Sequence, residues 1–121
     1  MKFLSRRLVM PIDLNSRGTL FGGRLLSWID EEASVFAAVE SGAGLVLTKY
    51  ISEMDFQNPS VLGDVLEIGM EIVSTTRVSI TLKCQVRDLR SRRNIVKIDK
   101  MVFIAIDEKG RPTRHELGVT G

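Results

Sequence analysis

Asp30 is the residue of this sequence whose type and surroundings most suggest a chemical role. It lies within residues 13–37, on the edge of the apolar arc of a predicted helix. A carboxylate that is shielded from water on one side is a better base than one that is fully solvated. The alternative is an ordinary solvated carboxylate, of the kind that Glu31 and Glu32 beside it represent. Position 30 could therefore hold a general base or a nucleophile.

Two adjacent glycines, Gly22 and Gly23, stand where that helix is expected to begin. The first N–H groups of a helix have no partner within it, and the absence of a Cβ would let a carbonyl oxygen approach them. The pair could therefore stabilise an oxyanion, or it could simply allow a tight passage from loop to helix. Asn15 in the preceding loop offers both a donor and an acceptor, although asparagine is also a common turn residue.

The chain contains only one histidine and one cysteine, so few sites could depend on either residue type. The single histidine, His115, lies in a polar tail, so a multi-histidine metal site is excluded and no metal is expected. The single cysteine, Cys84, cannot form an internal disulfide, and its place on the apolar side of a predicted strand assigns it to the core. A base of another type, such as a carboxylate, is therefore the better candidate.

The composition predicts one soluble, cytoplasmic domain. The chain has 121 residues, of which 44% are hydrophobic and 26% charged, and this is ordinary for a globular protein. A net charge of +2 does not indicate a nucleic-acid partner. We expect no membrane partner either, because no apolar run reaches the length of a membrane span and no signal peptide is recognisable at the N-terminus.

The elements that must position these residues are one helix and a set of strands. The helix is expected from Gly22 or Gly23 to Glu40, stopped by Gly42, and it is apolar around most of its circumference, as buried helices are. Alternating apolar residues predict strands over residues 3–10, 45–56, 65–73, 78–87 and 95–106, and residues 107–121 form a polar tail expected to be disordered or loosely docked. The simplest architecture is a single α+β domain, a curved antiparallel sheet wrapped around one central helix, which is the hotdog fold.

Several motifs follow one another in a fixed order over roughly residues 7–106. They are Met10-Pro11-x-Asp13-x-Asn15-x-x-Gly18-x-x-Phe21-Gly22-Gly23, the helical Asp30, Thr48, Met54-x-Phe56-x-x-Pro59-x-x-x-Gly63-Asp64 and Thr76-x-x-Ser79-Ile80. Together they resemble the acyl-CoA thioesterases of the YciA and brain acyl-CoA hydrolase type. The pairs Ala33-Ser34 and Pro59-Ser60 stand where Ala-Gly and Pro-Val are frequent in that family, and neither departure affects Asn15 or Asp30.

The resemblance implies a hydrolase of the hotdog fold that cleaves acyl-CoA to free acid and CoA without a cofactor. It implies Asp30 as base or nucleophile, Asn15 as a residue that orients water or polarises the thioester, and Gly22-Gly23 as the oxyanion site. Asparagine and aspartate of one active site come from two subunits in the resembling enzymes, which commonly form hexamers as trimers of hotdog dimers. We therefore expect a homodimer here, and a hexamer built from three dimers.

Two groups of basic residues are candidates to hold the phosphates of CoA, which need cationic partners. The resemblance indicates Arg77 with Ser79, at the start of the strand over residues 78–87. The second group lies at a predicted hairpin tip, which could alternatively be a solvated loop that discourages edge pairing; it comprises Arg87, Arg90, Arg92, Arg93 and Lys97.

Two other functions for the same fold remain open at this point. A non-catalytic hotdog module could bind acyl-CoA as a sensor or regulator, although such a module has no need for a carboxylate at an apolar edge. A hotdog dehydratase is less suitable, because the resembling dehydratases use a histidine near the helix and His115 is far from it in sequence.

Overall fold

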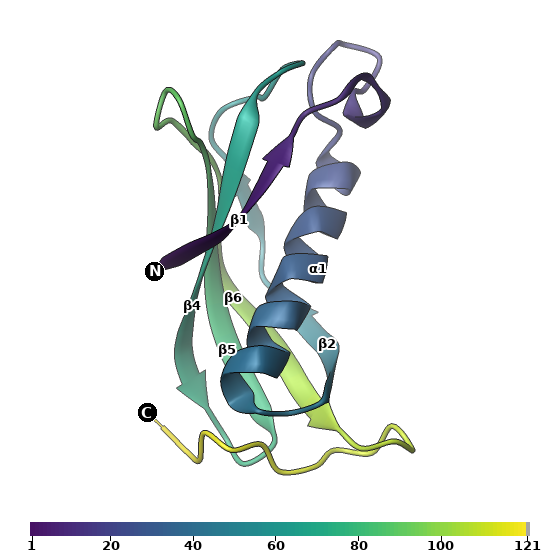
Figure 1. Ribbon diagram of the computed structural model, residues 1–121, viewed down its shortest axis with the longest axis vertical. Helices are drawn as coiled ribbons and strands as arrows, with labels where there is room; N and C mark the ends of the chain where they lie inside the picture. Colours follow the sequence, from purple (N-terminus) through teal and green to yellow (C-terminus); the bar gives the residue numbers. More distant parts are fainter. Residues whose placement is uncertain (121) are drawn as a thin grey trace.

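A single long helix packed on one face of an antiparallel sheet makes up the computed structural model, which describes residues 1–120 (Figure 1). The last residue of the predicted tail, Gly121, lies outside the described residues. The elements in chain order are β1 Lys2–Leu8, the short 3-10 helix η1 Pro11–Asp13, α1 Gly22–Ser41, β2 Leu45–Ile51, β3 Met54–Phe56, β4 Val65–Thr75, β5 Ser79–Asp88 and β6 Asn94–Ile106.

The sheet has the strand order β1-β4-β5-β6-β2, and β3 pairs with β6 beyond the end of β2. All pairs are antiparallel, and α1 runs along one face of the curved sheet (Figure 1). This confirms the α+β architecture of one helix wrapped by an antiparallel sheet. The prediction of one continuous strand over residues 45–56 is wrong. The Ser52 hydroxyl accepts the Lys100 N–H at 3.1 Å, as a strand carbonyl otherwise would, and the ladder is interrupted there between β2 and β3.

The core lies between α1 and the sheet, as the periodicity of the helix predicts. Six apolar helix residues are at least nine-tenths buried and belong to the core between α1 and the strands; they are Leu25, Trp28, Ile29, Ala33, Phe36 and Ala37. The helix stops at Gly42, whose φ of 72° is a left-handed conformation that glycine adopts without strain. Within residues 1–120, no helix combines the length and apolar character needed to cross a membrane.

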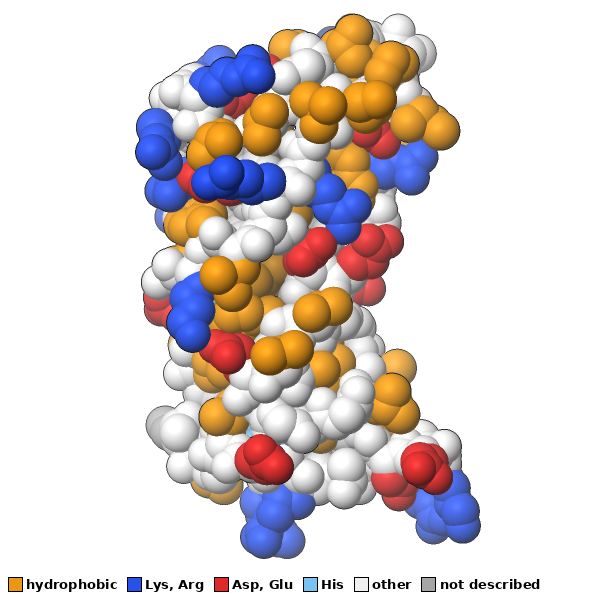
Figure 2. Space-filling model, in the orientation of Figure 1, with side chains coloured by type: hydrophobic (Ala, Val, Ile, Leu, Met, Phe, Trp, Pro, Cys, Tyr) orange, Lys and Arg blue, Asp and Glu red, His pale blue; other side chains and the backbone are white. Residues whose placement is uncertain are grey.

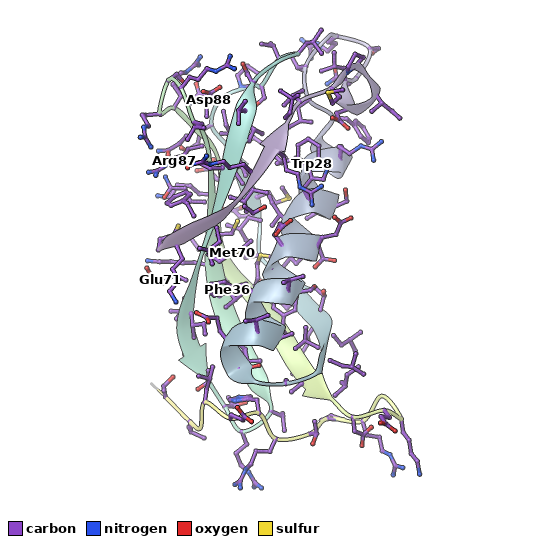
Figure 3. All side chains as sticks on the ribbon, viewed as in Figure 1. Trp28, Phe36, Met70, Glu71, Arg87 and Asp88 are labelled. Atoms are coloured by element: carbon purple, nitrogen blue, oxygen red, sulfur yellow. The ribbon has the colours of Figure 1, made fainter. Side chains whose placement is uncertain are left out.

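Trp28 and Phe36 show how α1 is attached to the strands at the β1 side of the sheet (Figure 3). Trp28 is buried, and the guanidinium carbon of Arg7 lies 5.7 Å from the centroid of its ring. The same guanidinium contacts Glu32 at 2.9 Å and Glu31 at 3.2 Å, and these hydrogen bonds raise the pKa of Arg7. Trp28 is therefore packed within its own chain, between the helix and an edge strand.

Of the two expectations for the C-terminal tail, disordered or loosely docked, its described part follows the second and is docked on the sheet. His115 is 3% exposed, accepts the Leu117 N–H at Nδ1 and donates from Nε2 to the carbonyl oxygens of Thr76 and Ser79 at 2.6 and 3.1 Å. Thr120 exchanges hydrogen bonds with Thr75. These contacts fasten the tail to the turn between β4 and β5.

We expect His115→Ala to lower the free energy of unfolding by about 2 kcal/mol, because it removes a buried ring together with its hydrogen bonds to the Thr76 and Ser79 carbonyl oxygens and from the Leu117 N–H. Urea unfolding followed by circular dichroism measures the change. The exposed neighbour Arg114 provides the matched control, and Arg114→Ala should leave the free energy of unfolding unchanged within about 0.5 kcal/mol. Equal stability of the two variants would show that the tail contributes nothing to the fold.

Candidate active site

Asp30 lies near the middle of α1 on the side that faces β2. Its Oδ1 accepts a hydrogen bond of 2.8 Å from the hydroxyl of Thr48, a β2 residue that points to the helix side of the sheet. Its Oδ2 forms no hydrogen bond or ion pair with any of the described residues 1–120. The carboxylate is thus half-buried, fixed through one oxygen and available through the other, which is an arrangement suited to a base or a nucleophile.

Asn15 lies in the loop that leads into α1, and its side chain is tied into that loop. Its Oδ1 accepts the N–H groups of Arg17 at 2.9 Å and Thr19 at 3.1 Å, and its Nδ2 donates to the Thr19 hydroxyl at 2.9 Å. Asp13 fixes the loop from the other side. It accepts the Met10 N–H at 2.9 Å, is buried, and forms an ion pair of 3.3 Å with the Nε of Arg24 in the first turn of the helix.

The N-terminus of α1 opens into a cavity. Gly22 and Gly23 are the first two helical residues, and within the described part of the chain their N–H groups have no hydrogen-bond acceptor. A cavity of about 360 Å³ lies beside them, and its lining comprises Thr19, Leu20, Gly22, Phe56, Gln57, Asn58 and Pro59. A Cβ on Gly23 would come within 2.8 Å of the Phe21 ring, whereas one on Gly22 would meet Phe56 at an ordinary 3.5 Å. The position of Gly23 therefore favours glycine for steric reasons as well.

A single chain does not bring all four predicted catalytic residues together. Asn15 is close to the helix N-terminus with Gly22 and Gly23, but Asp30 is eight residues further along α1, about 12 Å at the rise of an α-helix. No contact in residues 1–120 joins the side chains of Asn15 and Asp30. The chain thus supplies two partial sites: a donor group at the helix N-terminus and a carboxylate beside β2.

The two groups of basic candidates lie at opposite ends of β5. Arg77 and Ser79 are at its start, next to the docked tail, where Ser79 and Thr76 share a hydrogen bond of 2.6 Å. Arg90 and Arg93 follow its end, about 30 Å away for a strand of ten residues. Figure 2 shows Lys and Arg side chains gathered at the upper left, where Figure 1 places the β5–β6 hairpin. One chain therefore cannot apply both groups to the same phosphate.

The hairpin arginines differ in how far they are engaged elsewhere in the described structure. Arg87 and Arg92 both contact the buried carboxylate of Glu67, and Arg87 also lies 3.8 Å from the centroid of the Phe3 ring. Arg93 donates a hydrogen bond of 2.6 Å to Asn58, which lines the cavity at the helix N-terminus. Arg93 is therefore the hairpin arginine that is connected to this cavity.

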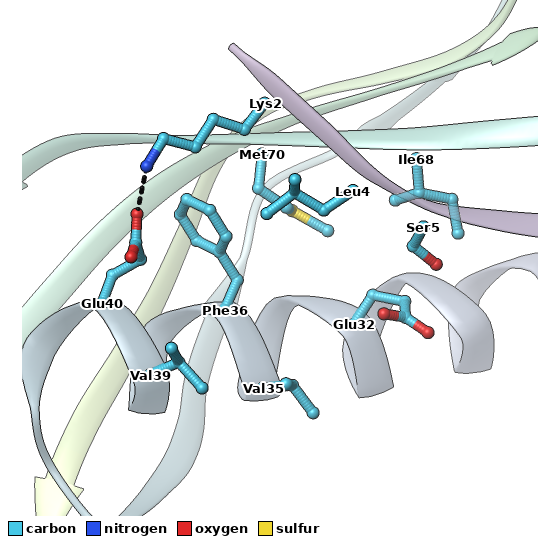
Figure 4. A pocket seen from close by; sticks show the side chains of 10 residues that line it. All are labelled: Lys2, Leu4, Ser5, Glu32, Val35, Phe36, Val39, Glu40, Ile68 and Met70. Atoms are coloured by element: carbon cyan, nitrogen blue, oxygen red, sulfur yellow. Dashed lines mark hydrogen bonds and ion pairs between the residues drawn. The ribbon is translucent and has the colours of Figure 1, made fainter.

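An apolar groove between β1 and α1 lies apart from these residues (Figure 4). Its volume is about 140 Å³, and Lys2 and Glu40 form an ion pair of 2.7 Å beside it. Leu4, Val35 and Val39 line it and are exposed to solvent by 75%, 59% and 72%. None of the predicted catalytic residues contributes to the groove, so we do not assign the reaction to it.

Cys84 is buried in the core, as predicted, at 2% exposure. Burial raises the pKa of its thiol from 9.0 to about 12, so the nucleophilic thiolate is absent at neutral pH. We expect a thiol reagent such as DTNB to leave the folded protein unlabelled and its hydrolytic activity intact, but to label the chain in denaturant. Rapid labelling of the native protein with loss of activity would contradict this.

The raised pKa of Cys84 also has a consequence for stability. Below pH 9 the thiol is protonated in both the folded and the unfolded chain, so the full stability is present there. Between pH 9 and about 12 the unfolded chain loses this proton first, so the contribution of Cys84 to the free energy of unfolding is lost as the pH rises.

Sequence reasoning gave no role to Thr48 or Thr19. Thr48 belongs to the motif pattern quoted above, but its contact with Asp30 spans eighteen residues, and only the packing of α1 on β2 reveals it. Thr19 carries no signal beyond its position four residues after Asn15, which is a spacing compatible with a turn closed by side-chain hydrogen bonds.

Comparisons with known proteins agree with this geometry. The family model of the thioesterase superfamily matches residues 17–94. The acyl-CoA thioester hydrolase YciA of Escherichia coli strain K12 is 33% identical over 113 residues, which cover 88% of this chain and 85% of YciA. The hexameric thioesterase y2039 of Yersinia pestis superposes with a TM-score of 0.90 at 29% identity, over 97% of both chains.

A solved structure of an acyl-CoA hydrolase from Staphylococcus aureus, in complex with butyryl coenzyme A and coenzyme A, is also similar. It is 30% identical with a TM-score of 0.81, over 92% of this chain and 66% of that one. Solved variants of that hydrolase carry alanine in place of an asparagine, of an aspartate fifteen residues later and of a threonine seventeen residues beyond the aspartate. Asn15 and Asp30 are likewise fifteen residues apart, and Thr48 follows eighteen residues later. The chain therefore belongs to the thioesterase superfamily, among the acyl-CoA thioester hydrolases of the YciA type.

Proposed function

We propose that this protein hydrolyses acyl-CoA thioesters to a free acid and CoA. The observation that carries the proposal is the state of Asp30, whose carboxylate is oriented by Thr48 through one oxygen and free through the other. An oxygen that is held in place and has no partner among the described residues is available to a water molecule or to the thioester carbon. The names of YciA as an acyl-CoA thioester hydrolase and of the Staphylococcus aureus protein as an acyl-CoA hydrolase support acyl-CoA as the substrate.

In the proposed reaction, the free oxygen of Asp30 accepts a proton from water as the water oxygen adds to the thioester carbon. Alternatively it attacks that carbon itself, and the mixed anhydride left when CoA departs is cleaved by water to the free acid and the Asp30 carboxylate. The carbonyl oxygen gains negative charge in this step, and the unpaired N–H groups of Gly22 and Gly23 at the positive end of α1, which the partner subunit supplies together with its Asn15, stabilise it. The bond to sulfur then breaks, and CoA leaves as the thiol after it takes up a proton. These steps use side chains, backbone and water alone.

The complete site, in this proposal, contains residues of two chains. In the described structure the outer edge of β2 pairs with no strand, and the sheet carries exposed apolar side chains there, with Leu45 and Leu47 exposed by 51% and 55%. A second copy that pairs with this edge antiparallel would cover them and close an otherwise open sheet edge. Asp30 and Thr48 lie beside that edge, so Asn15 of the partner subunit can complete the site.

The same two-fold pairing would bring the two separated groups of basic residues, one from each subunit, to the same end of the dimer. It reverses the direction of the second chain, so the β4–β5 turn of one subunit lies at the same end as the β5–β6 hairpin of the other. Arg77 and Ser79 of one chain and Arg90 and Arg93 of the other could then contact a single CoA molecule. The hexameric state of the Yersinia pestis neighbour supports three such dimers in one particle.

A panel of acyl-CoA substrates of increasing chain length tests the proposed function. Thiol release measured with DTNB gives turnover, and isothermal titration calorimetry gives binding of the same compounds. We expect turnover for at least one chain length, at a kcat above about 1 s⁻¹, as is usual for enzymes. Binding throughout the panel without thiol release would instead identify an acyl-CoA sensor.

A further inference from the structure

The side-chain amide of Asn15 can be oriented in only one way within its loop. Its Oδ1 receives two backbone N–H groups, from Arg17 and Thr19, and its Nδ2 donates to the Oγ1 of Thr19. Exchange of the two ends of the amide would place an NH₂ group against both backbone N–H groups and leave them without an acceptor. The loop therefore fixes which atom of Asn15 is presented on each side.

The hydrogen-bonding capacity of this amide is almost used up. A carbonyl oxygen has two lone pairs, and both are occupied by the N–H groups of Arg17 and Thr19. An amide nitrogen has two hydrogens, of which one is bound to Thr19. The single group of Asn15 that is left for a ligand is therefore one N–H, so Asn15 can donate to a substrate but cannot accept from a catalytic water.

Thr19 is held firmly enough to serve as the partner of Asn15. It forms an isolated bridge with Val61, its carbonyl oxygen accepts the Asn15 N–H at 2.8 Å, and the next residue, Leu20, donates to the Ser60 carbonyl at 2.8 Å. Thr19 also lines the cavity that contains Gly22. The amide of Asn15 is thus fixed relative to the helix N-terminus, where the thioester oxygen is proposed to bind.

We propose that Thr19 is a positioning residue that holds Asn15 as a hydrogen-bond donor for the thioester carbonyl oxygen. This rests on the proposed function, because it assigns a role within the same reaction. As the tetrahedral intermediate forms, the oxygen becomes negative, and a preoriented N–H stabilises it without reorganisation; the charge disappears when the carbon–sulfur bond breaks. Thr19 acts through Asn15 and leaves the acid–base step to Asp30.

Replacement of Thr19 by valine and by serine tests this role. Thr19→Val keeps the β-branched shape but removes the acceptor, and we expect kcat to fall about tenfold with KM changed less than about twofold, because a lost orientation affects the transition state more than binding. Thr19→Ser keeps the acceptor and should retain activity within about twofold. Thr19→Ala provides a second variant without the acceptor, in case the valine side chain disturbs the loop. Thermal unfolding must show that the variants compared are folded.

A double-mutant cycle separates positioning from a general loss of structure. In an Asn15→Ala background, Thr19→Val should change kcat by less than about twofold, because its effect operates through the absent amide. An undiminished tenfold loss in that background would overturn the proposal. So would wild-type kcat in both Thr19→Val and Thr19→Ala, or a loss in Thr19→Ser as large as in Thr19→Val.

The results that would refute the proposed function differ from those that would refute the positioning role of Thr19. A wild-type protein that releases no thiol from any acyl-CoA would refute the proposed function. Activity that is retained by Asn15→Ala would remove Asn15 from that function, and Thr19 with it. An active wild type, an impaired Asn15→Ala variant and an unimpaired Thr19→Val variant would overturn only the role of Thr19.

Discussion

Asp30→Asn is expected to reduce acyl-CoA hydrolysis by about a thousandfold and to leave the fold intact. The substitution keeps the size of the side chain and an oxygen that can still accept the Thr48 hydrogen bond of 2.8 Å. It replaces the free carboxylate oxygen by an amide nitrogen that can neither take up a proton nor attack a carbonyl carbon. Positioned acid–base groups contribute about a hundredfold to ten-thousandfold to rates, which sets the expected size.

The matched control for Asp30→Asn is Glu31→Gln, which makes the same chemical change one residue further along α1. The Glu31 side chain is 63% exposed and contacts Arg7 at the surface at 3.2 Å, so its loss should change hydrolysis by less than about twofold. Thiol release under saturating substrate gives kcat, and thermal unfolding verifies the fold. More than a tenth of wild-type activity in Asp30→Asn would exclude Asp30 as base and as nucleophile.

Mixing two strongly impaired variants is expected to restore activity. If Asn15 and Asp30 of one site belong to two subunits, a dimer of one Asn15→Ala chain and one Asp30→Asn chain contains one site with both substitutions and one site with neither. Random pairing of equal amounts makes about half of the dimers mixed, so about a quarter of the wild-type activity should appear. Co-expression with two different affinity tags, followed by purification on both, removes particles that contain a single variant; because the proposed particle holds three dimers, the purified mixture should still show about a quarter of the wild-type activity.

Two controls accompany the mixing experiment. Each variant alone should keep the same low residual activity before and after the mixing procedure. A chain that carries both substitutions, mixed with wild type, can form no mixed dimer with an intact site, because each site then has one substitution. Absence of recovery in the first mixture, although mixed dimers are isolated, would show that a site draws both residues from one chain.

The sequence was sufficient for the helix and the general architecture because their signals are local. The apolar face of α1 repeats with the helical period, and Gly42 marks its end as predicted. The alternation in β4, β5 and β6 specifies strands that short turns connect in antiparallel order. The α+β hotdog architecture follows because one apolar helix and one amphipathic sheet can bury their apolar surfaces only against each other.

The departures from prediction depend on contacts between distant residues. The break between β2 and β3 arises from a hydrogen bond of Ser52 to Lys100, 48 residues away. The sequence of the tail is polar and has no apolar periodicity. His115 is nevertheless buried, and its two ring nitrogens form hydrogen bonds with Thr76, Ser79 and Leu117. Neither contact leaves a periodic trace in the sequence, and composition alone indicates a loop in both cases.

The candidate site, too, combines features that the sequence predicts with features that only the structure shows. The resemblance to a family, through the order of its motifs along the chain, indicates Asn15, Asp30 and the glycine pair as candidates, and their catalytic roles remain predictions. Spacing could not show that Asp30 is engaged through only one oxygen, nor that the Asn15 amide has a single N–H to offer. These properties depend on Thr48 and Thr19, whose side chains reach the site from another strand and from across a turn.

In the proposed dimer, the hydrogen bond between Thr48 and Asp30 would make the reaction depend on the concentration of the protein itself. Thr48 belongs to the edge strand that a second copy would pair with, so the backbone that orients the carboxylate is also the backbone on which the subunits associate. Dissociation would free this strand and separate the two halves of the site in one event. By mass action, the specific activity should then fall on dilution below the dissociation constant of the dimer, and rise again when substrate that binds across both subunits is added.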